Sequence, residues 1–419
     1  MVQIPVPKPE NPVEPGEEET YGLSQEAPPP RPTFVPPPAV ARSAEEAYEQ
    51  AVNRTLLGDE RKKATRRSSS ASGKATAGIA PIASPKSATL PWLFALTLVP
   101  LVFSLLARAD DFEERLGRTV EAHPELLSKL AGDRDEFLAS LPEGRIDGAH
   151  LSSESWLHWL YAAIAAAFFC GLIVLLFERG EANTWQLLAV GAITAMVGIF
   201  LLLAFQWIAG ATQGFWVRGR GIIVLVFYII KFIGFSYQAA LNPENGFFLS
   251  FLGFTCGVGL CEEFIKALPL YMKVRNGDDL SWRAACVWGL ASGVGFGVAE
   301  GIMYAGDHYN GIATFGIYPV RFISCVGLHA IWTASVALML WHNQELAGGE
   351  LDWGDWLLSL LKVQGVPMLL HGLYDTLLKR DMHLLALVTA VASFVWLAFL
   401  LARSRASDPE PDRAALATA

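Results

Sequence analysis

The chain has 419 residues, of which 52% are hydrophobic and 17% are charged. A soluble domain carries about 25% charged residues, so this balance excludes an ordinary soluble protein and indicates a membrane protein. The formal net charge is −9, and no basic run with interleaved aromatic residues occurs, so nucleic acid is not an expected partner. The expected surroundings are the lipid bilayer of the cell membrane, which the chain crosses several times.

Residues 1–88 form a polar region with proline runs, clustered glutamates and a basic belt towards its end. This composition cannot bury enough apolar surface to fold, so a disordered N-terminal tail is predicted. A first transmembrane helix is expected at 89–107, and a polar helical insert at 108–155 follows it. The insert is either an ordinary connector or a small domain that docks substrate.

The remaining chain is a series of apolar segments, each long enough for a spanning helix of roughly 20 residues. Backbone groups in lipid must hydrogen-bond within the chain, which favours helices. The sequence therefore predicts an all-α polytopic membrane protein, a bundle of eight to nine transmembrane helices with a disordered N-terminal tail. The predicted centres lie near Val99, Ala166, Ala195, Phe227, Gly257, Gly293, Ala330, Lys362 and Ala392.

The segments group into transmembrane helices 2–4 at 156–246, a catalytic transmembrane core at 247–402 and a polar C-terminal tail at 403–419. Three basic residues inside apolar segments, Lys231, Arg321 and Lys362, are expected to reach towards the membrane surface or to pair locally. They are therefore left outside the candidate site.

Four short clusters of ionisable residues lie within the apolar segments of the second half of the chain. They are Glu262-Glu263 with Lys266, then Glu300, then His329, and then His371 with Asp375. A charge at the bilayer centre costs roughly 2.5–3.5 kcal/mol, and such residues usually face a bundle interior and mark a functional site. The clusters together predict an intramembrane enzyme whose catalytic residues are these seven.

The spacing within the clusters suggests how they pair. Residues three or four apart share a helix face, so Lys266 can reach either Glu262 or Glu263. Two adjacent carboxylates repel each other, which leaves one suited to hold a proton and the other to accept one. His371 and Asp375 are one turn apart, so Asp375 can fix the tautomer of the imidazole.

The helix that carries Glu300 is rich in glycine. Five glycines surround Glu300 in the sequence: Gly289, Gly293, Gly295, Gly297 and Gly301. Small residues let helices approach closely in membranes. We expect them to bring this helix against the helix of Glu262 and Glu263.

The order and spacing of the clusters resemble the PrsW family of intramembrane proteases. The matching motifs are Glu-Glu-x-x-Lys, Phe-x-x-x-Glu, a histidine in the next span, and His-x-x-x-Asp, with Phe296 as the phenylalanine. These proteins look like distant relatives of the CAAX prenyl proteases and the bacterial abortive-infection membrane proteins. The resemblance implies peptide-bond hydrolysis in the membrane and a membrane protein as substrate. In the family, known members cleave an anti-sigma factor in regulated proteolysis.

The mechanism expected from these residues is metal-independent, with no cofactor required. Glu262 or Glu263 acts as the general base on a water, and His371 positions that water or protonates the leaving amine. Lys266 holds the glutamates in register, and His329 stabilises the oxyanion.

Three alternatives stay open. A zinc-dependent intramembrane metalloprotease would use His329, His371 and a glutamate as ligands, with one position left for water. A proton- or ion-coupled transporter would use the same buried ionisable residues as a relay. A non-catalytic scaffold would keep the fold and bind membrane partners. The sequence indicates no particular oligomeric state.

Overall fold

The computed structural model describes residues 89–106, 112–130, 134–176, 182–276, 280–343 and 353–407. These residues form helices joined by short loops, and the described part contains no strand. The predicted N-terminal tail, 1–88, lies outside the described residues. So do residues 408–419 of the predicted C-terminal tail, whereas the last helix continues to Ser407.

Seven helical segments of the described chain are long and apolar enough to cross a membrane, which confirms an all-α polytopic membrane protein. They are α6 (Leu157–Leu176), α7 with α8 (Thr184–Ile193, Ile199–Ala211), α9 (Ile222–Leu241), α10 with α11 (Phe247–Gly253, Leu260–Arg275), α12 (Trp282–Tyr304), α13 with α14 (Ile317–Pro319, Val326–His342) and α17 (His383–Ser407). A shorter apolar helix, α2 (Thr89–Leu106), precedes them. The segment predicted around Lys362 is also helical, as α16 (Trp353–Lys379), but it is not among the seven.

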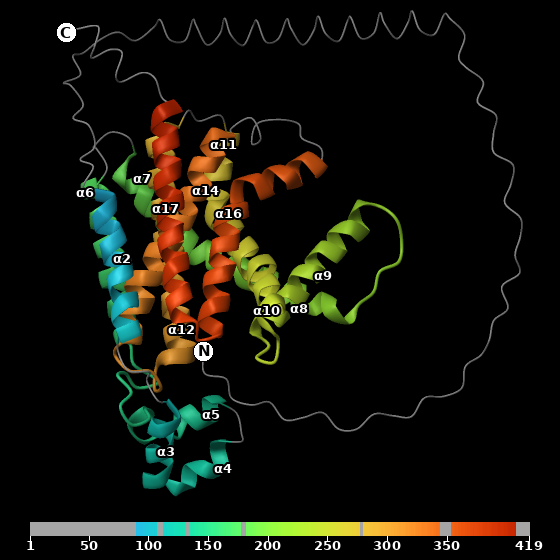
Figure 1. Cartoon of the computed structure of the whole chain (residues 1–419). Helices are drawn as coiled ribbons and strands as arrows, with labels where there is room; N and C mark the ends of the chain where they lie inside the picture. The colour runs from blue at the N-terminus through green and yellow to red at the C-terminus, as the bar shows by residue number, and fades with distance from the viewer. Residues whose placement is uncertain are drawn as a thin grey trace, which may run out of the picture. The chain divides into compact units, whose positions relative to one another are not determined.

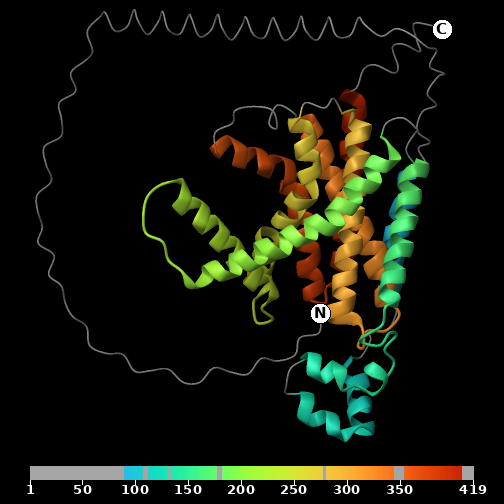
Figure 2. The same cartoon turned by 180° about the vertical axis from the view of Figure 1, so that it is seen from behind.

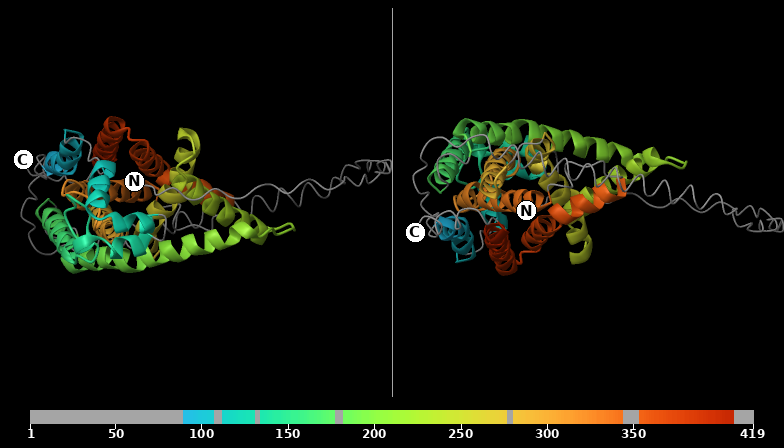
Figure 3. Two further views of the ribbon diagram at one scale, coloured as in Figure 1. Left: turned by 90° about the horizontal axis from the view of Figure 1, so that it is seen from below. Right: turned by 90° about the horizontal axis from the view of Figure 1, so that it is seen from above.

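Helix α14 lies at the centre of the bundle. It contacts α11, α12, α16 and α17, and 83% of the residues in the apolar part of its span are buried. Only 22% of α9 is buried, because α9 and α8 reach out to one side (Figure 1). From behind, α7 and α8 form one long tilted helix across the bundle (Figure 2), and both end-on views show this helix along one side (Figure 3).

Three glycines of α12 pack against α14, and α12 also contacts α11, the partner expected from the sequence. A Cβ atom at Gly289, Gly293 or Gly297 would overlap backbone atoms of α14, so a larger residue would force the two helices apart. The three are spaced by four residues and so share one helix face. Gly295 points elsewhere and meets Gly191 of α7. Close approach therefore joins the helices of Glu300 and His329.

Turns of π-helix adjoin the helices that carry the ionisable clusters. η5 (Phe254–Gly259) leads into α11, η6 (Ala305–Tyr309) follows α12, and η7 (Val320–Cys325) leads into α14. Such turns often occur at functional sites, because they rotate the following residues relative to a regular helix. In α16, Pro367 removes one helical hydrogen bond ahead of His371, and Figure 1 shows the first part of α16 turned away from the rest.

The insert contains three short helices, α3 (Phe112–Ala122), α4 (Leu127–Leu130) and α5 (Arg134–Ala139). Its own small core includes Leu138 and Leu141, whereas Leu127 of the same predicted apolar pattern is 61% exposed. Main-chain hydrogen bonds join the end of the insert to the loop between α12 and α13, from Ile146 N to Gly311 O and from Gly311 N to Leu151 O. The insert is thus attached to the loop that connects the helices of Glu300 and His329.

Candidate active site

The two glutamates and the lysine of the first cluster lie in the first two turns of α11. Glu262 is 4% exposed, and Glu263 and Lys266 are fully buried. The Lys266 ammonium donates to Glu263 Oε1 over 2.6 Å and lies 3.9 Å from Glu262 Oε2. Lys266 therefore lies near both carboxylates, as the spacing predicts, but it bonds to Glu263.

The second and third clusters meet between α12 and α14. His329 Nε2 lies 2.6 Å from Glu300 Oε2, and His329 Nδ1 lies 2.9 Å from Lys266 Nζ. The Lys266 ammonium can only donate hydrogen bonds, so it favours the tautomer in which His329 Nδ1 accepts and the proton lies on Nε2, beside Glu300. His329 thus links the carboxylate on α12 to the ammonium on α11.

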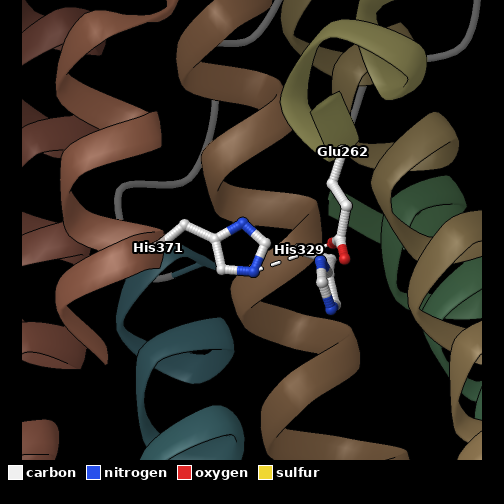
Figure 4. Close-up of side chains that lie close together, drawn as sticks. All are labelled: Glu262, His329 and His371. Atoms are coloured by element: carbon white, nitrogen blue, oxygen red, sulfur yellow. Dashed lines mark ion pairs between the residues drawn. The ribbon is translucent and has the colours of Figure 1, made fainter. Parts of the chain in front are cut away.

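The fourth cluster completes the group from α16. His371 Nδ1 lies 2.9 Å from Glu263 Oε1, while Nε2 lies 3.7 Å from Glu262 Oε2 (Figure 4) and 3.4 Å from Asp375 Oδ2. The closest carboxylate to this imidazole is therefore Glu263, 108 residues away in sequence, rather than Asp375 one turn away. Asp375 is the most exposed member, with 26% of its side chain accessible.

All seven residues singled out in the sequence belong to this one connected cluster. It contains Glu262, Glu263, Lys266, Glu300, His329, His371 and Asp375. Four helices that follow one another along the chain, α11, α12, α14 and α16, contribute to it. The arrangement offers carboxylates, imidazoles and an ammonium within a few ångströms of one another, which is the chemistry that acid–base catalysis requires.

Two further residues belong to the site that the sequence interpretation left out. Arg321 Nη2 lies 2.9 Å from Glu300 Oε1, and its guanidinium covers the ring of Tyr304 at 4.1 Å. Trp332 stacks on the His371 ring, with centroids 4.3 Å apart and planes 17° apart. Two sequence signals pointed to them. Arg321 is a basic residue inside an apolar segment, the next one after the segment of Glu300, and Trp332 is an aromatic residue three positions after His329.

The cluster fits a divalent metal. One ligand atom from each of Glu262, His329 and His371 lies within 4.8 Å of the other two, and all three residues are buried. Among the described residues, Glu262 Oε2 has no hydrogen-bond partner, which is costly for a buried carboxylate oxygen. One carboxylate and two imidazoles also form a ligand set that catalytic zinc uses.

The charges of the cluster support the same conclusion. Besides the two histidines it contains four carboxyl groups (Glu262, Glu263, Glu300, Asp375) and two basic groups (Lys266, Arg321). With all four carboxyl groups ionised and both histidines neutral, the cluster would carry an excess of two negative charges. Buried charges need partners in a medium of low dielectric, and a divalent cation or two added protons would balance this excess.

The fold and the site define a polytopic α-helical membrane protein with a buried carboxylate–imidazole centre. Residues 200–402 match the model of the PrsW family, described as an intramembrane metalloprotease family. The match spans all seven clustered residues and supports a PrsW family intramembrane protease over this part of the chain. No curated protein and no solved structure matches the chain.

Proposed function

We propose that the chain hydrolyses peptide bonds of membrane proteins in the cell membrane, with a divalent metal, zinc in the first instance, held by Glu262, His329 and His371. The observation that carries this is the convergence of these three buried ligands around a Glu262 oxygen that lacks a hydrogen-bond partner. The family description agrees with it. The substrate class that the family suggests is a single-pass membrane protein, such as an anti-sigma factor.

Neighbouring carboxylates orient the two imidazoles for metal binding. Glu263 Oε1 accepts from His371 Nδ1, so His371 Nε2 stays available on the side of Glu262. Glu300, held by Arg321, lies beside His329 Nε2, so that His329 Nδ1 is the unprotonated nitrogen of the ring. Carboxylate partners of this kind orient ligand histidines and raise their basicity.

Hydrolysis adds the hydroxyl of water to the carbonyl carbon and a proton to the leaving amine. A bound divalent cation would supply a Lewis acid and make its water nucleophilic near neutral pH. In the protein itself, Asp375 is not one of the three ligands and lies 3.4 Å from His371 Nε2, and we assign it to take a proton from the water and pass it to the leaving amine. Asp375, the most exposed group, is placed to exchange that proton with solvent.

A metal-free mechanism is the second candidate, and one contact favours it. Lys266 Nζ lies 2.9 Å from His329 Nδ1, so the ammonium would compete with a metal for the lone pair of that nitrogen. In that mechanism Glu262 activates water directly, and Lys266 with His329 stabilises the oxyanion. General acid–base catalysis of this kind contributes about 10²–10⁴-fold to the rate.

The test is cleavage of co-expressed single-pass membrane proteins by wild type, Glu262→Gln and His371→Ala, with metal analysis of each purified protein. The proposal expects cleavage and one bound metal in wild type, and loss of both in the two variants. Glu244→Gln, in an exposed loop, is the matched control that should change neither. Cleavage by metal-free wild type that stops in Glu262→Gln would favour the second mechanism. Equal cleavage by all variants would contradict both.

A further inference from the structure

Trp332 lies beside three of the seven residues of the cluster. Besides its stack on His371, its ring meets the His329 ring edge-on at 5.7 Å and lies 5.9 Å from Lys266 Nζ. It is 2% exposed. Trp332 therefore forms one wall of the centre, although it offers the reaction neither a base nor a metal ligand.

The indole is held from outside the site by α17. Trp332 Nε1 donates to Ser393 Oγ over 2.9 Å, and Ser393 Oγ donates in turn to Thr389 O over 2.9 Å. Ser393 is 1% exposed, so water does not compete for this bond. Since the serine hydroxyl has a partner for both its hydrogen and a lone pair, it fixes the indole in one orientation.

The orientation of the His371 ring depends on more than its hydrogen bond. Its bond to Glu263 holds one edge of the ring, but rotation about the last side-chain torsion of histidine is soft. A flat neighbour at 4.3 Å restricts that rotation, because tilting the imidazole would break the stack. The face and the edge of His371 are thus fixed by two different helices, α14 and α11.

We propose that Trp332 and Ser393 are positioning residues, which hold the His371 imidazole with Nε2 directed at Glu262. Trp332 acts through its stack, and Ser393 acts through Trp332. The inference rests on the proposed function, because it takes His371 as a residue of the reaction. It brings into the site α17, which carries none of the four ionisable clusters.

The chain supplies a matched control. Ser404 is a second fully buried serine of α17, and its Oγ lies 3.0 Å from Nε2 of His342 on α14. The same two helices are thus joined by a second serine contact with an aromatic nitrogen, 11 residues further along α17. Replacing Ser404 removes a bond of the same kind at a place that contacts no residue of the site.

The experiment compares wild type with Ser393→Ala, Ser393→Thr and Ser404→Ala in two measurements. The first is kcat and KM of substrate cleavage. The second is the nitrogen NMR spectrum of protein labelled at the histidine rings, in which the His371 signals are assigned by their loss in His371→Ala. The ring nitrogens report the tautomer and its exchange directly, whether or not the protein cleaves a substrate.

We expect Ser393→Ala to lower kcat about tenfold with KM unchanged, the lower end of the effect of outer partners on metal-site residues. Its His371 signals should broaden or shift. Ser393→Thr keeps the hydroxyl and should restore both readouts, while Ser404→Ala should alter neither. Unchanged His371 signals in Ser393→Ala, or the same response in Ser404→Ala, would overturn the inference. If wild type cleaves nothing, the proposed function fails, and the His371 signals still decide the role of Ser393.

Discussion

The centre of the bundle and the outlying hairpin formed by α8 and α9 each contain a lysine, and the two lysines are bound in different ways. Lys266, at the centre, is fully buried and bonds to the side chains of Glu263 and His329. Lys231, in the middle of α9, reaches main-chain carbonyls at the end of α8, with Nζ 2.6 Å from Phe215 O and 2.9 Å from Gln213 O. Carbonyls at a helix C-terminus lack partners within the helix and attract cations.

The difference separates a functional charge from a structural one. Lys231 satisfies groups that any helix end leaves open, and the ring of Trp216 covers its ammonium at 4.1 Å. Lys266 joins side chains of two helices, α11 and α14, and neither helix needs it to complete its backbone hydrogen bonds. A lysine whose partners are a carboxylate and an imidazole side chain therefore indicates a functional site, whereas a lysine bonded to main-chain carbonyls at a helix end indicates capping.

The largest effect is expected from Lys266→Met, which keeps the length and removes the charge. It leaves Glu263 buried without its cation, and loss of one partner of a buried pair typically costs about 3–5 kcal/mol. We expect a marked fall in the thermal unfolding temperature in detergent, together with loss of cleavage. Stability equal to wild type would show that the centre does not depend on this charge.

Helix packing at the centre gives the next largest effect. Gly295 of α12 meets the backbone of Gly191 on α7, whereas a Cβ at Gly171 of α6 would have no neighbour within 4 Å. Gly295→Ala should destabilise the fold by about 1–3 kcal/mol through overpacking. Gly171→Ala, the matched change at an open position, should leave thermal unfolding unchanged, and a similar loss in both variants would contradict the packing seen here.

Sequence patterns predicted the parts of this architecture that depend on local spacing. The helices at the nine predicted centres follow from apolar length, and the reach of Lys266 to its neighbouring glutamates follows from the helical period. The pairing of His371 with Glu263 joins residues 108 positions apart, and helical period carries no information about it. The same holds for the face of α12, because glycine spacing shows that a helix can be approached but not which helix approaches.

The partner of Arg321 was missed for a related reason. A basic residue in an apolar segment can place its charge at low free-energy cost in two ways. It can extend to the membrane surface or bond to a nearby main-chain carbonyl, and these are the interpretations that sequence alone favours. Lys231 takes the second. Arg321 instead lies on the π-helical turn η7, opposite Glu300 on the previous helix, and this placement depends on how α12 and α14 cross.

The smallest effect is expected from Lys231→Met, and it tests the comparison most directly. The change removes an ammonium that contacts carbonyls at a part-exposed position, so water or lipid headgroups can take its place at a helix end. We expect a loss of under about 1 kcal/mol, within the range of charge effects at helix termini, and cleavage equal to wild type. Thermal unfolding and the cleavage rate, measured beside Lys266→Met, supply the contrast. A loss of cleavage in Lys231→Met without a loss of stability would mean that the outlying hairpin takes part in the reaction, because local capping alone cannot change turnover at a centre formed by α11, α12, α14 and α16.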